Sequence, residues 1–407
     1  MTMKKRGVLE GVKVLDVAHA YSAALTGSLL ADLGAEVLCI EHPTGSPVRQ
    51  TLPRSKGQAL WWKNMARGKR CITLNLNSPK GRELLLSIAP QFDLMVENFR
   101  PGTLEKWKIG PADLEAAGAN LSLLRISGYG QTGPYRDKPG FGTIAEAFSG
   151  FAHLNGFPDG PPVFPSIALA DGVSATFGAF GLMASMVNRL RTGRKGVDVV
   201  DVALFESLFR LSPVQVMAYD QLGQDLKRPG NLLSTLGLIR NLYTTLDGAS
   251  FVVSTVGVTT IRRLLVGAAV SPSLIDQLDK GMFERPNEEV TAFIVACDAE
   301  IAAWAKTKTW EQAQALLQTA DVIFERVYTT KDIMEDPQYA AREDVVTVHD
   351  TQLGSVKMSG VVPKFSEFDH SVRHGGPGLG EHNDEVYGAL FGIDAAGLEE
   401  LRKQGIA

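Results

Sequence analysis

The stretch VKVLDVAHAYSAALTGSLLADLGAEVLCIE, residues 12–41, decides the fold class. It begins with an apolar run at 12–17, continues with small and apolar residues at 22–33 up to Gly34, and ends with a second apolar run at 37–41. Short apolar runs predict buried strands, and the longer run that stops at a glycine predicts a helix. Strands joined through a helix run parallel, so this stretch predicts a β-strand, α-helix, β-strand unit of a parallel sheet.

The same alternation continues along the chain. Further strands are expected at 71–76, 93–99, 121–127 and 197–202, and Ser78 and Pro79 predict the cap and first residue of an intervening helix. A parallel, doubly wound α/β sheet is therefore predicted for residues 1 to about 200.

A second domain is predicted after a change of composition at 221–231. A strand pair around Asp247-Gly248 and helices near 259–269 and 288–306 indicate an α+β domain over 220–325. The tail is long enough to return to the first domain. We therefore expect a large domain over 1–210, completed by 326–407.

Composition excludes several function classes. The 407 residues carry a formal net charge of -4, which gives no general attraction to nucleic acid or to anionic membranes. The uncharged run 172–188 is shorter than the roughly 20 residues of a bilayer-spanning helix, so no membrane span is expected. Three distant cysteines and seven histidines without ligand spacing predict neither disulfide nor metal site. We expect a cytoplasmic protein.

Asp171 is the one ionisable residue at the head of that uncharged run. One interpretation is a helix N-cap, which stabilises by about 1 kcal/mol. The other is a nucleophile that is kept ionised at a positive helix end, beside glycines that admit a bulky substrate. The pattern alone does not separate the two.

Two further segments follow predicted strands. Asn98, Phe99 and Arg100 lie at a strand end, where parallel sheets bind ligands, although an ordinary solvated turn gives the same pattern. The glycine-rich stretch 127–142 is typical of a substrate-facing loop. Glu41 ends a strand like the ribose-binding acid of a dinucleotide site, but no glycine occurs from Asp16 to Leu25, which disfavours a dinucleotide.

Together, the segments VENFRPGTLEKWKIG (96–110), SGYGQTGPYRDKPGFG (127–142), IALADGVSATFGAFGLMAS (167–185) and RTGRKGVDVVDVALFESL (191–208) resemble the family III CoA-transferases, the CaiB/BaiF family. The resemblance covers most of residues 10 to 210 and is looser beyond. It implies a Rossmann-like large domain, a small domain and an interlocked homodimer. It also implies a reaction without a tightly bound cofactor, in which Asp171 carries first the acyl group and then CoA.

The resemblance further implies that the substrates are an acyl-CoA and a small carboxylic acid. A C4 to C6 dicarboxylate or hydroxy acid, exchanged against succinyl-CoA, is preferred over carnitine, because 210–330 shows no tight aromatic cluster. The implied CoA contacts are His42, Leu74, Asn75, Asn98, Phe99, Arg100, Lys106, Lys138 and Phe141.

Two departures from related patterns bear on the reaction. Formyl-type enzymes have a glutamine where this chain has Tyr21, which disfavours formyl-CoA. The related α-methylacyl-CoA racemases have histidine and aspartate where this chain has Phe141 and Gly142, and a phenylalanine exchanges no proton. A racemase-like isomerase and a catalytically silent CoA-binding homologue remain alternatives.

Overall fold

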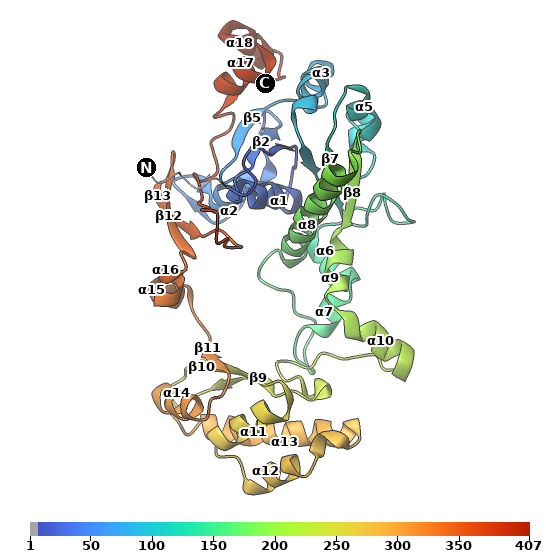
Figure 1. Cartoon of the computed structure of the whole chain (residues 1–407). Helices are drawn as coiled ribbons and strands as arrows, with labels where there is room; N and C mark the ends of the chain where they lie inside the picture. Colours follow the sequence, from blue (N-terminus) through green and yellow to red (C-terminus); the bar gives the residue numbers. More distant parts are fainter. Residues whose placement is uncertain (1–6) are drawn as a thin grey trace. The chain divides into compact units, whose positions relative to one another are not determined.

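The structure is a computed structural model that describes residues 7–407. Its contacts divide the chain into two compact units. The large unit comprises the residues up to Phe151, Pro165–Pro213 and Pro337–Ala407, and the small unit comprises Ala152–Phe164 and Val214–Asp336. Figure 1 labels their elements.

The large unit is built on a parallel sheet. Its described strands follow the order β5 (Arg70–Thr73), β2 (Glu36–Glu41), β1 (Lys13–Asp16), β6 (Leu94–Glu97), β7 (Ser122–Ser127) and β8 (Asp198–Ala203). The chain starts at β1, moves outward through β2 and β5, and returns to the other side of β1 at β6. The predicted parallel α/β class is confirmed, and the reversal at β1 and β6 is where such sheets bind ligands.

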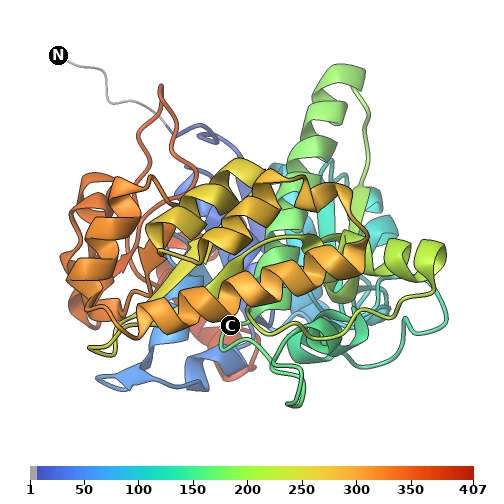
Figure 2. The same ribbon diagram turned by 90° about the horizontal axis from the view of Figure 1, so that it is seen from below.

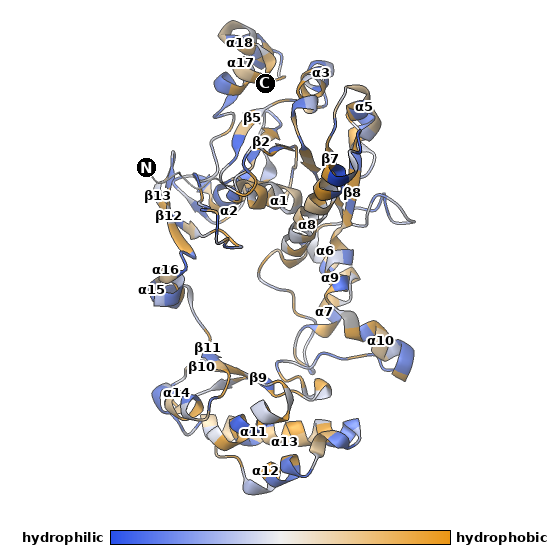
Figure 3. Cartoon of the chain, in the orientation of Figure 1, coloured by the Kyte–Doolittle hydropathy of each residue, from blue (hydrophilic) through white to orange (hydrophobic). Residues whose placement is uncertain are grey.

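Neighbouring residues of each strand point to opposite faces of this sheet, and both faces are covered. Val14, on β1, packs with α1 (Tyr21–Asp32) and α8 (Leu169–Thr192) on one face. Leu15 packs on the other face with α3 (Pro79–Ile88), α17 (Asn383–Phe391) and α18 (Ala395–Lys403). Figure 3 shows apolar colouring along much of α8. Burial on both faces explains why the strands read as apolar runs.

The end of the chain returns to the edge strand β5. Thr73 N–H donates to Asn383 Oδ1 at 2.9 Å, and Tyr387 O–H donates to the Thr73 carbonyl oxygen at 2.8 Å. Both side chains are buried, and each such bond stabilises by about 1 kcal/mol. These contacts join α17 to the sheet across more than 300 residues of sequence.

Shorter elements complete the large unit. They are β3 (Arg54–Ser55), β4 (Gln58–Ala59), α2 (Leu60–Met65), α4 (Thr103–Lys106), α5 (Pro111–Ala116), α6 (Gly142–Phe148), α9 (Leu204–Arg210), α16 (Pro337–Ala341), β12 (Val345–Asp350) and β13 (Gly354–Ser359).

The small unit combines an antiparallel sheet with helices. Its strands follow the order β11 (Phe324–Arg326), β10 (Ser250–Ser254) and β9 (Arg240–Thr244). Its helices include α11 (Gly257–Gly267), α12 (Pro272–Asp279), α13 (Asn287–Ala305), α14 (Trp310–Thr319) and α15 (Thr330–Glu335). All but the first residues of α7 (Phe151–Leu154) and α10 (Pro213–Leu222) also belong to this unit. Figure 2 shows the long helix α13 beside α11 and α12, with which it shares one apolar core.

The small unit includes a segment that was expected elsewhere. Residues 152–164 lie within the predicted large domain, 1–210, but their contacts are with the small unit. Gly230 N–H donates to the Gly156 carbonyl at 3.0 Å, and Arg228 donates to the carbonyl of His153 at 3.2 Å. These are backbone-directed bonds between distant segments, which leave no pattern in the local sequence.

Candidate functional site

Asp171 is the third residue of α8, which begins at Leu169. The N-cap position is Ala168, which makes no capping bond with its side chain. The interpretation of Asp171 as the N-cap is therefore wrong, because the helix starts two residues before the carboxylate. α8 is long and apolar enough to cross a membrane, but the core helices of soluble proteins meet the same criteria. In this structure α8 packs on α1, β7 and β8.

A small cavity of about 80 Å³ surrounds the Asp171 carboxylate. Its walls come from the carboxyl ends of β6 and β7, from α1 and α9, and from the glycine-rich loop. They include Asn98, Phe99, Arg100, Ser127, Arg136, Lys138, Gly140 and Phe141. The sheet and the loop thus place three cationic side chains around the cavity that contains one carboxylate.

Helix α6 closes one side of Asp171. A Cβ atom at Gly142 would lie 2.1 Å from Asp171 Oδ2, so only glycine fits at this position without moving the carboxylate. One turn further along α6, the buried Glu146 accepts a hydrogen bond from Ala170 N–H at 3.4 Å. Both residues therefore act on the first turn of α8.

The surroundings make Asp171 unusually basic. Burial, followed by the negative charge of Glu146, raises the pKa of Asp171 to about 6. Burial also raises the pKa of Glu146, although the hydrogen bonds from Ala170 N–H and Leu169 N–H lower it in part. Asp171 is thus ionised at neutral pH while remaining more basic than an ordinary aspartate, which suits a carboxylate nucleophile.

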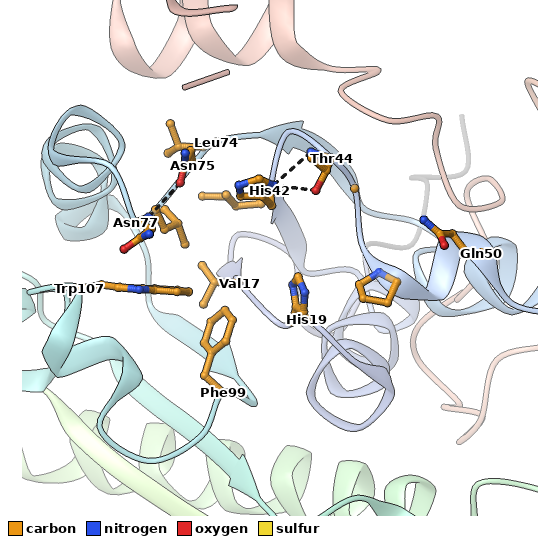
Figure 4. A pocket seen from close by; sticks show the side chains of 14 residues that line it. Val17, His19, His42, Thr44, Gln50, Leu74, Asn75, Asn77, Phe99 and Trp107 are labelled. Carbon is orange, nitrogen blue, oxygen red and sulfur yellow. Dashed lines mark hydrogen bonds between the residues drawn. The ribbon is translucent and has the colours of Figure 1, made fainter. Parts of the chain in front are cut away.

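A larger cavity of about 630 Å³ lies at the reversal of strand order (Figure 4). Its lining includes Val17, His19, His42, Leu74, Asn75, Asn77, Phe99 and Trp107. On one side of the cavity, the Phe99 and Trp107 rings pack edge to face with their centroids 4.9 Å apart. On the other side, His42 Nδ1 forms a hydrogen bond of 2.8 Å with the Thr44 hydroxyl. This volume is that of a site for a drug-sized or cofactor-sized ligand.

Phe99 lines both cavities, so the two are neighbours at the end of β6. Asn98, beside it, accepts a bond from His19 N–H at 2.9 Å and so fixes the turn between β1 and α1. The arrangement suits an extended ligand whose bulk occupies the larger cavity and whose reactive end reaches Asp171.

The predicted contact residues fall into four groups. His42, Leu74 and Asn75 line the larger cavity, Asn98, Arg100, Lys138 and Phe141 line the smaller one, and Phe99 lines both. Lys106, at the end of α4, is exposed and lines neither of these cavities. Glu41, considered as a ribose ligand, is buried and instead bonds Arg49 at 2.6 Å.

Two residues near Asp171 were missed by sequence reasoning. Arg136 stands in a loop with several charges, so no pattern singles it out. Glu146 is the one ionisable residue between Pro139 and Ala152, which is the same signal that drew attention to Asp171.

Comparison with known proteins identifies the family. The model of CoA-transferase family III matches residues 9–383. The chain belongs to CoA-transferase family III. It is 37% identical over 400 residues to the succinyl-CoA–D-citramalate CoA-transferase of Chloroflexus aurantiacus, covering 98% of both chains. It is 34% identical over 414 residues to the beta subunit of the succinyl-CoA–L-malate CoA-transferase of that organism, again covering 98% of both.

A solved structure of a family III protein is also similar. The crystal structure of a CaiB/BaiF family protein from Brucella suis superposes with a TM-score of 0.79 at 26% identity, covering 95% of this chain and 100% of that one. The match to family III and these relatives make the chain a CoA-transferase.

Proposed function

We propose that this CoA-transferase moves CoA from succinyl-CoA to a small hydroxy acid or dicarboxylic acid, with Asp171 as the covalent nucleophile. The observation that carries the proposal is the ionised, basic carboxylate of Asp171 in a cavity that also contains Arg100 and Lys138. The names of two relatives, which act on succinyl-CoA with D-citramalate or L-malate, support this substrate class.

The first half-reaction releases succinate. An Asp171 oxygen attacks the thioester carbon of succinyl-CoA, the C–S bond breaks, and CoA thiolate leaves a mixed anhydride on the enzyme. The thiolate then attacks the Asp171 carbonyl carbon of the anhydride. The C–O bond to the succinyl group breaks, which gives free succinate and an aspartyl-CoA thioester.

The second half-reaction repeats these steps with the acceptor. Its carboxylate attacks the aspartyl-CoA thioester, which releases the thiolate and forms a new anhydride. The thiolate attacks the acceptor carbonyl carbon, giving acceptor-CoA and free Asp171. The thioester energy is conserved throughout, provided that water is kept from the anhydride.

The two cavities suggest how the substrate lies. The nucleotide part of CoA would occupy the larger cavity between His42 and Trp107, and the thioester would pass Phe99 toward Asp171. Arg100 and Lys138 carry positive charge that attracts the phosphates or the acceptor carboxylate. Gly172 N–H already bonds the Ala168 carbonyl at 2.9 Å, so the developing oxyanion needs another donor.

A racemase requires an acid and a base on either side of the substrate α-carbon. At the two positions that resemble the racemase pair, this chain has Phe141, which is 72% exposed, and Gly142, which contacts Asp171. Neither exchanges a proton, so CoA transfer is the better account. The intact Asp171 also disfavours a silent CoA-binding homologue.

We further propose that the chain forms a homodimer. On α8, Phe180 is 71% exposed and Leu190 is 78% exposed in the single chain. Exposed apolar side chains of this size on a long helix suit a surface that another subunit covers.

The proposed function is tested by offering labelled succinyl-CoA with citramalate, malate, mesaconate, itaconate, glutarate or carnitine, and measuring each CoA ester by mass spectrometry. We expect CoA to pass to the hydroxy acids and dicarboxylates. Transfer only to carnitine would overturn the substrate class, and hydrolysis without any transfer would overturn the activity.

A further inference from the structure

Glu146 is a buried carboxylate without a cationic partner among the ion pairs of the described residues. Its side chain lies on α6 and is 3% exposed. Its contacts are backbone N–H groups at the start of α8, with Ala170 N–H at 3.4 Å from Oε1. A carboxylate in this position costs desolvation energy that a neutral residue would avoid, so its presence here needs a reason.

Gly142 and Glu146 are four residues apart and therefore lie on the same face of α6. Gly142 touches the Asp171 carboxylate, and Glu146 holds the turn of α8 on which Asp171 stands. Ala168, at the N-cap, provides no side-chain bond to this turn. One face of α6 thus fixes both the backbone and the side chain of Asp171.

We propose that Glu146 is a positioning residue for Asp171, which holds the first turn of α8 and places a negative charge beside the nucleophile. By accepting the Ala170 N–H, Glu146 occupies a donor at the positive helix end that would otherwise stabilise ionised Asp171. Asp171 is therefore less stabilised as an anion and stays more basic. This inference rests on the proposed role of Asp171.

Other charged groups also face Asp171. Tyr21 on α1 has its pKa raised by burial and then by the charge of Asp171. Arg100, Arg136 and Lys138 line the same cavity, to which α9 and β7 contribute the apolar Leu204 and Ile126. Among these groups, Glu146 is the neighbouring charge that opposes ionisation of Asp171.

The consequence is chemical, because a more basic oxyanion is a stronger nucleophile, as is known for thiolates. Replacing Glu146 with glutamine keeps an oxygen acceptor for Ala170 N–H and removes only the charge. We expect Glu146→Gln to shift the acid limb of the profile of kcat/KM against pH toward lower pH by about one unit. The shift follows because removing a neighbouring negative charge lowers the pKa of a carboxyl group. We also expect a lower plateau of kcat and a KM for succinyl-CoA close to that of the wild type.

A second readout does not depend on turnover. Carbon-13 labelling of aspartate side chains gives the titration midpoint of the Asp171 carboxyl, identified by its absence in Asp171→Asn. We expect this midpoint to fall in Glu146→Gln. The matched control is Glu206→Gln, which removes the same charge from an exposed position of α9 and leaves the midpoint unchanged.

Should Glu146→Gln not fold, the same coupling is measured from the other side. Interacting carboxyls shift each other by equal amounts, so Asp171→Asn must lower the titration midpoint of labelled Glu146. Unchanged midpoints in both directions would overturn the proposal. A chain that transfers no CoA but shows coupled midpoints would refute the proposed function alone, and transfer without coupling would refute the role of Glu146 alone.

Discussion

Asp171 is ionised at neutral pH at a cost to the folded state. Its pKa is raised from 3.8 to about 6, so the folded protein binds its proton more tightly than the unfolded chain does. The folded state therefore keeps its full stability below about pH 4 and loses some as the pH rises through 6. A shift of this size corresponds to about 3 kcal/mol, which partial solvent contact reduces.

This cost predicts that the neutral variant is more stable than the wild type. Asp171→Asn should raise the free energy of unfolding at pH 8 by about 1–2 kcal/mol, with a difference that shrinks toward pH 4. Urea unfolding followed by circular dichroism at both pH values measures it. A variant that is destabilised equally at both pH values would show that the carboxylate has a structural role.

Arg100 and Lys106 were both expected to contact CoA, but only Arg100 lines a cavity that the structure describes near Asp171. Arg100→Ala should raise KM for succinyl-CoA about tenfold, through loss of a charge-assisted bond of about 1.5 kcal/mol, with kcat nearly unchanged. Lys106→Ala is the matched control and should leave both constants within about threefold. Steady-state kinetics with both variants measures this, and a larger effect of Lys106 would reverse the assignment.

At the scale of elements, the contact between α6 and α8 controls the site. A methyl group at Gly142 would meet Asp171 Oδ2 at 2.1 Å, whereas one at Gly172 would meet no atom within 4 Å apart from its chain neighbours and the backbone of its own helix. Both glycines have backbone conformations that alanine adopts. Alanine at Gly142 would displace the carboxylate, whereas alanine at Gly172 only adds a methyl group near it. Comparing the two variants therefore distinguishes these effects.

We expect Gly142→Ala to lower kcat at least tenfold, because the carboxylate must move away from its place, while Gly172→Ala stays within about threefold. Kinetics with circular dichroism as the folding control measures this. Equal losses in the two variants would contradict the account.

Elements with strong local signals were predicted well. The apolar runs and the glycine after the helix predicted β1, α1 and β2. As expected, Ser78 caps α3, and its side chain accepts a hydrogen bond from Gly81 N–H. The start of α8 was misplaced because its N-cap, Ala168, gives no signal. Glu146 was missed because its role depends on α6 meeting α8, which a single helix does not encode.

At the scale of the whole molecule, contacts between distant segments complete the large unit. The bonds from Thr73 to Asn383 and Tyr387 join residues that no local pattern relates. The length of the segment 326–407 predicted that it returns to the large domain. The sequence did not predict that α17 packs on the edge strand β5. Likewise, residues 152–164 group with the small unit through contacts with the distant segment near Gly230, which no local pattern indicates.

The proposed homodimer should not dissociate on dilution without unfolding, because the interlocked subunits that the family resemblance implies would have no folded monomer to separate into. Sedimentation over a wide concentration range, with circular dichroism on the same samples, tests this. We expect the dimer and the helical signal to be lost together. A folded, active monomer would contradict the proposal.

The account as a whole depends on a covalent bond to Asp171. The most direct measurement incubates the protein with succinyl-CoA but no acceptor, adds hydroxylamine, and analyses the peptides by mass spectrometry. The account predicts a hydroxamate on Asp171 that requires succinyl-CoA and is absent in Asp171→Asn. An unmodified Asp171 peptide from protein that is turning over, or a hydroxamate on another residue, would contradict it.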